Sequence, residues 1–227
     1  MTNHNHHIEI IPAILPRDFG EVEQKIDQIM GSVKTVQIDV CDGQFTPSAS
    51  WPYRKHDDTF EKIIHEEVGL PDWENLNYEF DLMVNRPEEV VDEWVTAGAA
   101  RIIIHAEATG DVAKAIEMLQ GRVEVGLALA MDTDLSVIAK YREQIGFIQL
   151  MGIDNVGFQR QPFDEKTLGR IKEAHLKYPG LPISIDGGVS LETAPELIAA
   201  GADRLVVGSA VFDSGNPIEA VANLQQL

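Results

Sequence analysis

Cysteine, basic residues and long apolar runs are all scarce in this sequence of 227 residues. The single cysteine, Cys41, excludes an internal disulfide and fits a reducing, cytoplasmic setting. Lys and Arg number 18 against 37 Asp and Glu, which gives a formal net charge of −19. Nucleic-acid backbones and anionic membrane surfaces attract basic proteins, so the sequence predicts neither as a partner. No stretch reaches the roughly 18 consecutive apolar residues of a membrane-spanning helix.

The first seven residues differ in character from the rest. Residues 1–7 (MTNHNHH) are polar, are not of the signal-peptide type and predict a disordered tail, although their histidines are a metal-binding residue type. The chain is 44% hydrophobic, which is enough to bury a core. No linker, repeat or low-complexity segment divides the remainder. We therefore expect a single domain over residues 8–227, for which a homo-oligomer is one option.

Short β-rich runs alternate with amphipathic helical runs along the chain. The expected strands cover residues 8–15, 34–40, 77–84, 101–107, 123–130, 146–153, 181–188 and 204–212. Each is followed by a helical pattern, and eight such units in about 225 residues predict a closed (β/α)₈ barrel, the TIM barrel. An open doubly wound sheet is disfavoured because PAILPRDF, residues 12–19, lacks the glycine-rich G-x-G-x-x-G turn. The long loop over residues 41–58 is expected to form a lid or rim over the barrel mouth.

One face of the expected strands is unusually polar. Side chains alternate along a strand, so one parity of each strand faces the barrel interior. The more polar parity, which we assign to the interior, comprises Gln37, Asp39, Glu79, Asp81, Met83, His105, Glu107, Gln149, Met151, Ser184 and Asp186. Buried carboxylates cost several kcal/mol each unless they are paired or bind a metal. We therefore interpret Asp39 and Asp186 as catalytic acids at the C-terminal mouth, and His105 as either a site residue or a satisfied core histidine.

Glycine-rich segments follow the seventh and eighth strands. These are IDGGVS over residues 185–190 and VVGSAVF over residues 206–212. In barrels of this class the loops after these two strands often bind phosphate through backbone N–H groups. The small residues that would admit the phosphate are Gly187, Gly188, Gly208 and Ser209. The overall negative charge does not exclude an anion there, because distant charges are screened within about 8 Å at physiological salt.

Several longer stretches occur in a fixed order along the chain. They are IIPAILPRDF, VQIDVCDGQFTPS, FDLMVNRPEE, IIIHAEA, GLAL, FIQLMG followed by GFQRQPF, ISIDGGVS and VVGSAVF. On these stretches the sequence resembles the ribulose-phosphate 3-epimerase family over essentially its whole length. The resemblance implies a (β/α)₈ barrel of the ribulose-phosphate binding type. It also implies an enzyme that inverts a carbinol carbon next to the ketone of a small phosphorylated sugar.

The resemblance further implies roles for particular residues. Asp39 and Asp186 stand where two aspartates trade a proton through an enediolate, from opposite faces of the substrate. A divalent metal usually lies between them, and Met83 and Met151 match the methionines that cap the site. The phosphate loop is implied to begin at Gly157.

The implied metal shell departs from the family pattern. Two histidines usually complete it, but this chain has Gln37 and Asp81 at those positions. Together with Asp39 and Asp186 they would offer three carboxylates and one amide oxygen, a set that suits Mg²⁺ or Mn²⁺ better than Zn²⁺. A metal-free site in which one aspartate keeps a proton is the competing prediction, because clustered carboxylates repel one another.

Other departures concern the first strand and the phosphate loop. Ala13 replaces the usual serine, and Cys41 stands where a third methionine is usual. Residues 157–161 read GFQRQ instead of G-F-G-G-Q. Arg160 in this loop is either an additional contact to phosphate or a solvated loop cation.

Two alternatives to an epimerase remain at this point. A phosphosugar lyase or decarboxylase on the same scaffold usually carries a D-x-K-x-x-D motif, and the segment Asp39-Val40-Cys41-Asp42 lacks its lysine. A phosphate-ligand binding protein that lost catalysis together with the two histidines is the other alternative.

Overall fold

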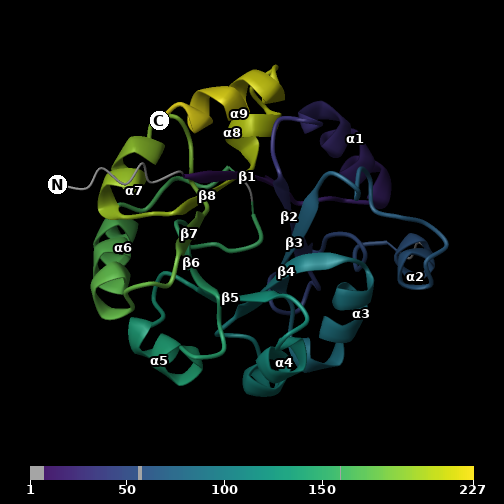
Figure 1. The fold of residues 1–227 in the computed structure, drawn as a ribbon, viewed down its shortest axis with the longest axis horizontal. Helices are drawn as coiled ribbons and strands as arrows, with labels where there is room; N and C mark the ends of the chain where they lie inside the picture. The colour runs from purple at the N-terminus through teal and green to yellow at the C-terminus, as the bar shows by residue number, and fades with distance from the viewer. Residues whose placement is uncertain (1–7, 56–57, 159) are drawn as a thin grey trace.

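The computed structural model describes residues 8–55, 58–158 and 160–227. Within these ranges eight parallel strands follow one another around a closed barrel, in the order β1 to β8, and β8 pairs with β1. Helices surround the barrel, as Figure 1 shows. The predicted (β/α)₈ barrel is thereby confirmed. The N-terminal tail expected over residues 1–7, with its histidines, lies outside the described residues.

The strands are short and their bounds lie close to those expected. They are β1 (Glu9–Ile14), β2 (Thr35–Cys41), β3 (Asn77–Met83), β4 (Ala99–His105), β5 (Glu124–Leu129), β6 (Phe147–Met151), β7 (Ile183–Asp186) and β8 (Arg204–Val207). The eighth strand was expected to reach residue 212 and this was wrong. Gly208 leaves the extended conformation, at φ −88° and ψ −95°, and Ser209–Phe212 forms a short helix instead.

Helices and helical turns fill the connections between the strands. They are α1 (Phe19–Ile29), α2 (Thr59–Ile64), the 3₁₀ turn η1 (Pro87–Glu89), α3 (Val91–Thr96), α4 (Val112–Leu119), η2 (Leu135–Val137), α5 (Ile138–Tyr141), α6 (Lys166–Lys177), α7 (Ala194–Ala200), α8 (Ser209–Phe212) and α9 (Pro217–Gln225). In the part of the chain described, no helix is long and apolar enough to cross a membrane.

Helix α1 illustrates why these segments are helical. The Asp18 side chain accepts a hydrogen bond from the Glu21 backbone N–H and so caps the first turn. The residues that α1 buries recur three or four positions apart, which places them on one face: Phe19, Val22, Ile26 and Ile29. That face packs into the main apolar core between the helices and the barrel.

Strand β2 shows how the alternation of side chains separates core from site. Val36, Ile38 and Val40 belong to the apolar core between strands and helices. The alternate residues face the interior, where the β2–β3 register sets Gln37 beside Glu79 and Asp39 beside Asp81. The interior is therefore polar along this pair of strands, as the parity predicted.

A network of charged side chains closes the N-terminal end of the barrel. Arg101 contacts Glu9 (3.1 Å), Glu79 (3.4 Å) and Glu124 (2.9 Å), and Arg204 contacts Glu9 and Glu124 from the other side. The interior carboxyl of Glu79 thus belongs to this structural network and lies apart from the C-terminal mouth.

The loop after β2 is anchored in the core and reaches over the barrel mouth. Trp51 is buried and packs edge-on against Phe60, with ring centroids 5.6 Å apart. Closer to β2, the Phe45 ring lies 5.0 Å from the imidazole of His105. The described part of this loop therefore forms a rim above the polar interior.

Candidate active site

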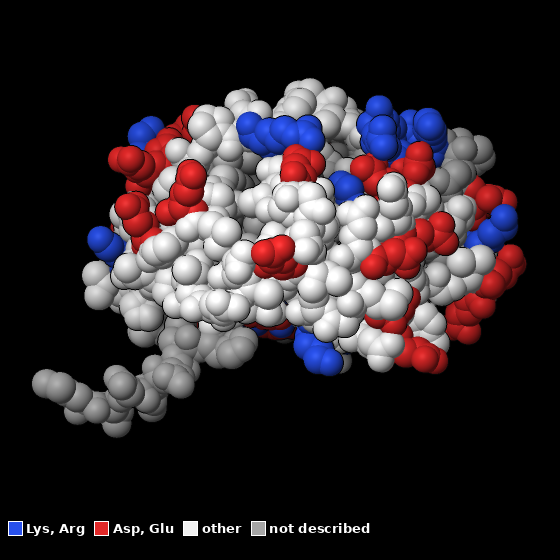
Figure 2. All heavy atoms as spheres, turned by 90° about the horizontal axis from the view of Figure 1, so that it is seen from above, with Lys and Arg blue, Asp and Glu red and all other residues white. Residues whose placement is uncertain are grey.

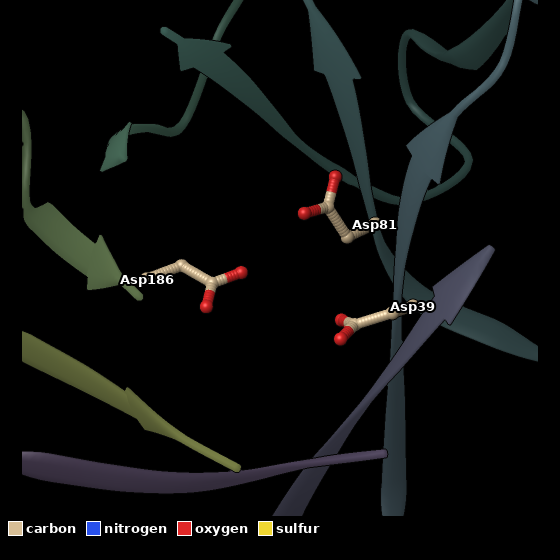
Figure 3. Close-up of side chains that lie close together, drawn as sticks. All are labelled: Asp39, Asp81 and Asp186. Carbon is tan, nitrogen blue, oxygen red and sulfur yellow. The ribbon is translucent and has the colours of Figure 1, made fainter. Parts of the chain in front are cut away.

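Three aspartates converge at the C-terminal mouth of the barrel. Asp39 on β2 and Asp81 on β3 are neighbours in register, and Asp186 ends β7. Figure 3 shows the Asp186 carboxylate reaching toward the other two from the opposite side of the barrel. One carboxylate oxygen of each lies within 4.8 Å of the other two. Asp81 is fully buried, whereas Asp186 is partly open to solvent.

Gln37 links the two aspartates predicted to be catalytic. Its Nε2 donates to Asp39 Oδ1 (2.7 Å) and to Asp186 Oδ2 (2.9 Å). The amide nitrogen, and not the oxygen expected for a metal ligand, therefore faces the carboxylates. Gln37 Oε1 is buried without a hydrogen-bond partner among the described residues. Such an orphaned acceptor is unfavourable in a protein interior and is a feature of sites that take a ligand.

Asp81 is held by two donors. His105 Nε2 lies 3.0 Å from Asp81 Oδ1, and Gln149 Nε2 donates to Asp81 Oδ2 at 3.0 Å. On the far side of the imidazole, His105 Nδ1 lies 3.8 Å from Glu107 Oε2. Burial would lower the pKa of His105, but the two carboxylates outweigh it and raise the pKa to about 10. The raised pKa favours a charged imidazole in this buried contact with Asp81, and a role of His105 in the site stays a prediction.

Glu107 completes this chain of charges toward the rim. Burial would raise its pKa, but contact with His105 and hydrogen bonds from Thr133 and the Ala130 N–H hold the pKa at about 2. Sequence reasoning placed His105, Glu107 and Gln149 in the interior but did not connect them to Asp81. The sequence signal that could have connected them is that all three lie on the interior-facing parity of their expected strands.

Asp39 and Asp186 have raised pKa values. Burial is the main cause for both, and the charges of neighbouring carboxylates add to it, while the hydrogen bond from Gln37 opposes it. Raised pKa values of this kind favour the retention of a proton by one of two interacting acids.

The three carboxylates also match the requirements of a divalent cation. Bonds of about 2.1 Å from Mg²⁺ to oxygen place two ligand oxygens at most about 4.2 Å apart. The three carboxylate oxygens lie within 4.8 Å of one another, so a small inward movement of these side chains would bring them to a cation. Gln37 would add a fourth oxygen only with its amide turned so that Oε1, in place of Nε2, faced the carboxylates. The residues thus fit a divalent metal held by Asp39, Asp81 and Asp186.

The other predicted site residues surround one pocket above these carboxylates. The pocket is lined by Asp39 and Asp186 together with Met83, Met151, Gly157, Gly187, Gly188, Gly208 and Ser209. Gln37 and Asp81 lie beneath it, fully buried. Every predicted substrate-binding residue therefore lies at the same cavity as the two acids.

Two glycines after β7 are required by the backbone. Gly187 and Gly188 have φ values of 103° and 69°, in the left-handed region that favours glycine. A Cβ on Gly188 would lie 2.7 Å from Phe163 Cα, and one on Gly187 would lie 2.7 Å from a side-chain carbon of Ile153. The close approach and the positive φ therefore leave no room for a side chain at either position.

The sequence is similar to proteins of one known family. The ribulose-phosphate 3 epimerase family model matches residues 9–212. The chain is 31% identical over 225 residues to the ribulose-phosphate 3-epimerase of Bacillus subtilis (strain 168), covering 96% of this chain and 98% of that protein. It is 27% identical over 210 residues to the ribulose-phosphate 3-epimerase of Escherichia coli (strain K12), and the match covers 90% of this chain and 88% of that protein.

A solved structure of 3-hexulose-6-phosphate synthase is similar in fold, with a TM-score of 0.68 at 20% identity, and the match covers 96% of this chain and 99% of that one. The family match covers nearly the whole barrel and includes both acidic strand ends. The chain belongs to the ribulose-phosphate 3-epimerase family.

Proposed function

We propose that this protein epimerises a small phosphorylated ketopentose, of the ribulose 5-phosphate type, at the carbon next to the ketone. The observation that carries the proposal is the pair Asp39 and Asp186, which face each other across the barrel mouth with raised pKa values. Inversion by two bases requires one carboxylate and one carboxylic acid at the same time. In the metal-free site, a proton shared by the pair supplies that state near neutral pH.

In this mechanism the two aspartates act on opposite faces of the substrate carbon. Asp39 takes the proton from one face, and the electrons of the broken C–H bond move toward the ketone oxygen to give an enediolate. Asp186 then delivers its proton to the other face, which forms the new C–H bond with inverted configuration. In the reverse direction the two residues exchange roles. Gln37, which bonds to both carboxylates, keeps them oriented.

The enediolate carries negative charge that the site must stabilise. The amide donors of Gln37 and Gln149 and the imidazolium of His105 already offset the charge of the aspartates. We propose Mg²⁺ or Mn²⁺ as the metal, held by the three aspartates, because hard cations prefer oxygen ligands. When bound, the cation supplies electrostatic stabilisation of the developing charge.

Two kinds of lining residue are proposed to bind the substrate. Met83 and Met151 offer apolar surface beside the acids, which excludes water from the reacting carbon. Gly157, Gly188 and Gly208 line the same pocket, and we propose that backbone N–H groups of these segments bind the phosphate.

Incubation with ribulose 5-phosphate in heavy water tests the proposal. We expect deuterium at the carbinol carbon and formation of the epimer, both visible by proton NMR. Breakdown of the sugar with loss of carbon would favour a lyase or decarboxylase. A thermal shift with ribulose 5-phosphate but without exchange or breakdown would favour a binding protein without activity.

A further inference from the structure

Arg160 occupies a distinctive position at the edge of the catalytic pocket. Among the described residues that line this pocket, it is the single positively charged side chain. It also lines a second, adjoining groove, which shares Leu15, Gly157 and Phe158 with the pocket. The guanidinium therefore lies where an anion would pass from the groove to the glycine-rich end of the pocket.

The backbone of Arg160 is in a conformation that favours glycine. Its φ is 61°, in the left-handed region, where a side chain other than Gly, Asn or Asp is uncommon. The loop motif of the family has glycine at this place. A residue that keeps an unfavourable backbone conformation points to a role for its side chain.

The contact that Arg160 makes within the protein is easily exchanged. Its Nε and Nη2 lie 3.0 and 2.9 Å from Asp213 Oδ2. The two side chains are 71% and 48% exposed, and exposed ion pairs contribute little to stability. A phosphate offers more charge and several oxygens, which suit the planar fork of a guanidinium.

The adjoining groove is positively charged although the chain has a net charge of −19. The described residues that line it include four cations against two carboxylates, Glu21 and Asp213; the cations are Arg17, Lys25, Arg54 and Arg160. Figure 2 shows several Lys and Arg side chains along the upper edge of that view, with Asp and Glu beside them and over the flank. A local field of this sign attracts an anionic substrate toward the pocket.

We propose that Arg160 is the phosphate-recognising side chain of this enzyme and that it exchanges Asp213 for the substrate phosphate. The groove beside it raises the local concentration of the anion. This assignment rests on the proposed function, since it places a phosphorylated substrate in the pocket of Asp39 and Asp186.

The test uses variants of the intact protein and inorganic phosphate as the probe. Arg160→Gly removes the guanidinium, so isothermal titration should give a phosphate affinity lower by about tenfold or more. Glycine also adopts the positive φ at this position without strain, so the melting temperature should not fall. Asp213→Asn frees Arg160 and removes a repelling carboxylate, and should tighten phosphate binding. KM for ribulose 5-phosphate should rise in Arg160→Gly and fall in Asp213→Asn.

Arg86→Gly is the matched control. Arg86 also has a positive φ, of 54°, and an ion pair, with Glu89, but it lines neither the pocket nor the groove. Its replacement should leave phosphate affinity unchanged. Unchanged affinity in both Arg160→Gly and Asp213→Asn, or an equal loss in Arg86→Gly, would overturn the assignment. A wild type that binds phosphate through Arg160 but does not epimerise would refute the proposed function alone.

Discussion

The buried pair of His105 and Asp81 should make the stability of the protein depend on pH in the alkaline range. The pKa of His105 rises from the ordinary value of 6.5 to about 10 in the folded state. Because the folded value lies above the unfolded one, the pair stabilises the fold fully below pH 6.5. That stabilisation is lost progressively as the pH rises toward 10.

The size of the effect follows from the shift. One pKa unit corresponds to about 1.4 kcal/mol, so raising the pH from 6.5 to 9.5 should remove about 4 kcal/mol. Both side chains are fully buried, so solvent screening reduces this little. His105→Gln keeps an amide that can donate to Asp81 but cannot titrate. The variant should therefore be less stable than the wild type by about 3–5 kcal/mol at pH 6, and by much less at pH 9.5.

Urea denaturation at pH 6 and pH 9.5, in the presence of a chelator, measures this difference. The exposed His175 provides the control, and His175→Gln should change the free energy of unfolding by less than about 0.5 kcal/mol at either pH. If the free energy of unfolding of the wild type exceeded that of His105→Gln by the same amount at both pH values, His105 would be neutral in the folded protein. The charge assignment would then be wrong.

Two further predictions concern the metal and the glycine-rich loop. Elemental analysis of protein purified without chelator should find Mg²⁺ or Mn²⁺ that dialysis removes, because the shell is all oxygen; stoichiometric zinc that survives dialysis would contradict the proposed shell. Gly188→Ala should lower the free energy of unfolding by about 2–4 kcal/mol, since the added Cβ meets the Phe163 backbone and the φ is positive. Gly121→Ala has a similar φ of 72° but open space around the added Cβ, so it should cost only about 1–2 kcal/mol. Equal losses in the two alanine variants would refute the close approach at Gly188.

The alternation of side chains along the strands predicted most of the site. In a closed barrel one parity must face inward, so Gln37, Asp39, Asp81 and Asp186 could be assigned to the interior from the sequence alone. The position of each side chain along the barrel axis, nearer one end or the other, is harder to predict. Glu79 shares the parity of Asp81 but belongs to the charged network at the opposite end of the barrel.

The contact of His105 with Asp81 depends on geometry that the sequence does not carry. The β3–β4 register shifts between Tyr78 and Glu79, and Asp81 pairs with Ile103 along the backbone. His105 lies two residues further along β4, and its side chain reaches back to Asp81 through the barrel interior. A local shift of this kind has no signature in the periodicity, so the pairing could not be predicted.

The orientation of Gln37 was likewise beyond the sequence. A glutamine offers a donor and an acceptor at nearly the same position, and the surrounding charges decide which end faces them. Three carboxylates favour the donor, so Nε2 contacts Asp39 and Asp186 and Oε1 is left without a described partner.

The central claim is that Asp39 and Asp186 each serve one face of the substrate carbon. Its most direct test follows solvent deuterium into each of the two epimers separately, by proton NMR, with Asp39→Asn and Asp186→Asn. Each variant keeps one base, so we predict that neither epimerises, and that each exchanges the proton of one epimer only, with opposite preferences. If either variant exchanged both epimers, or epimerised at close to the wild-type rate, the two aspartates would not divide the faces between them.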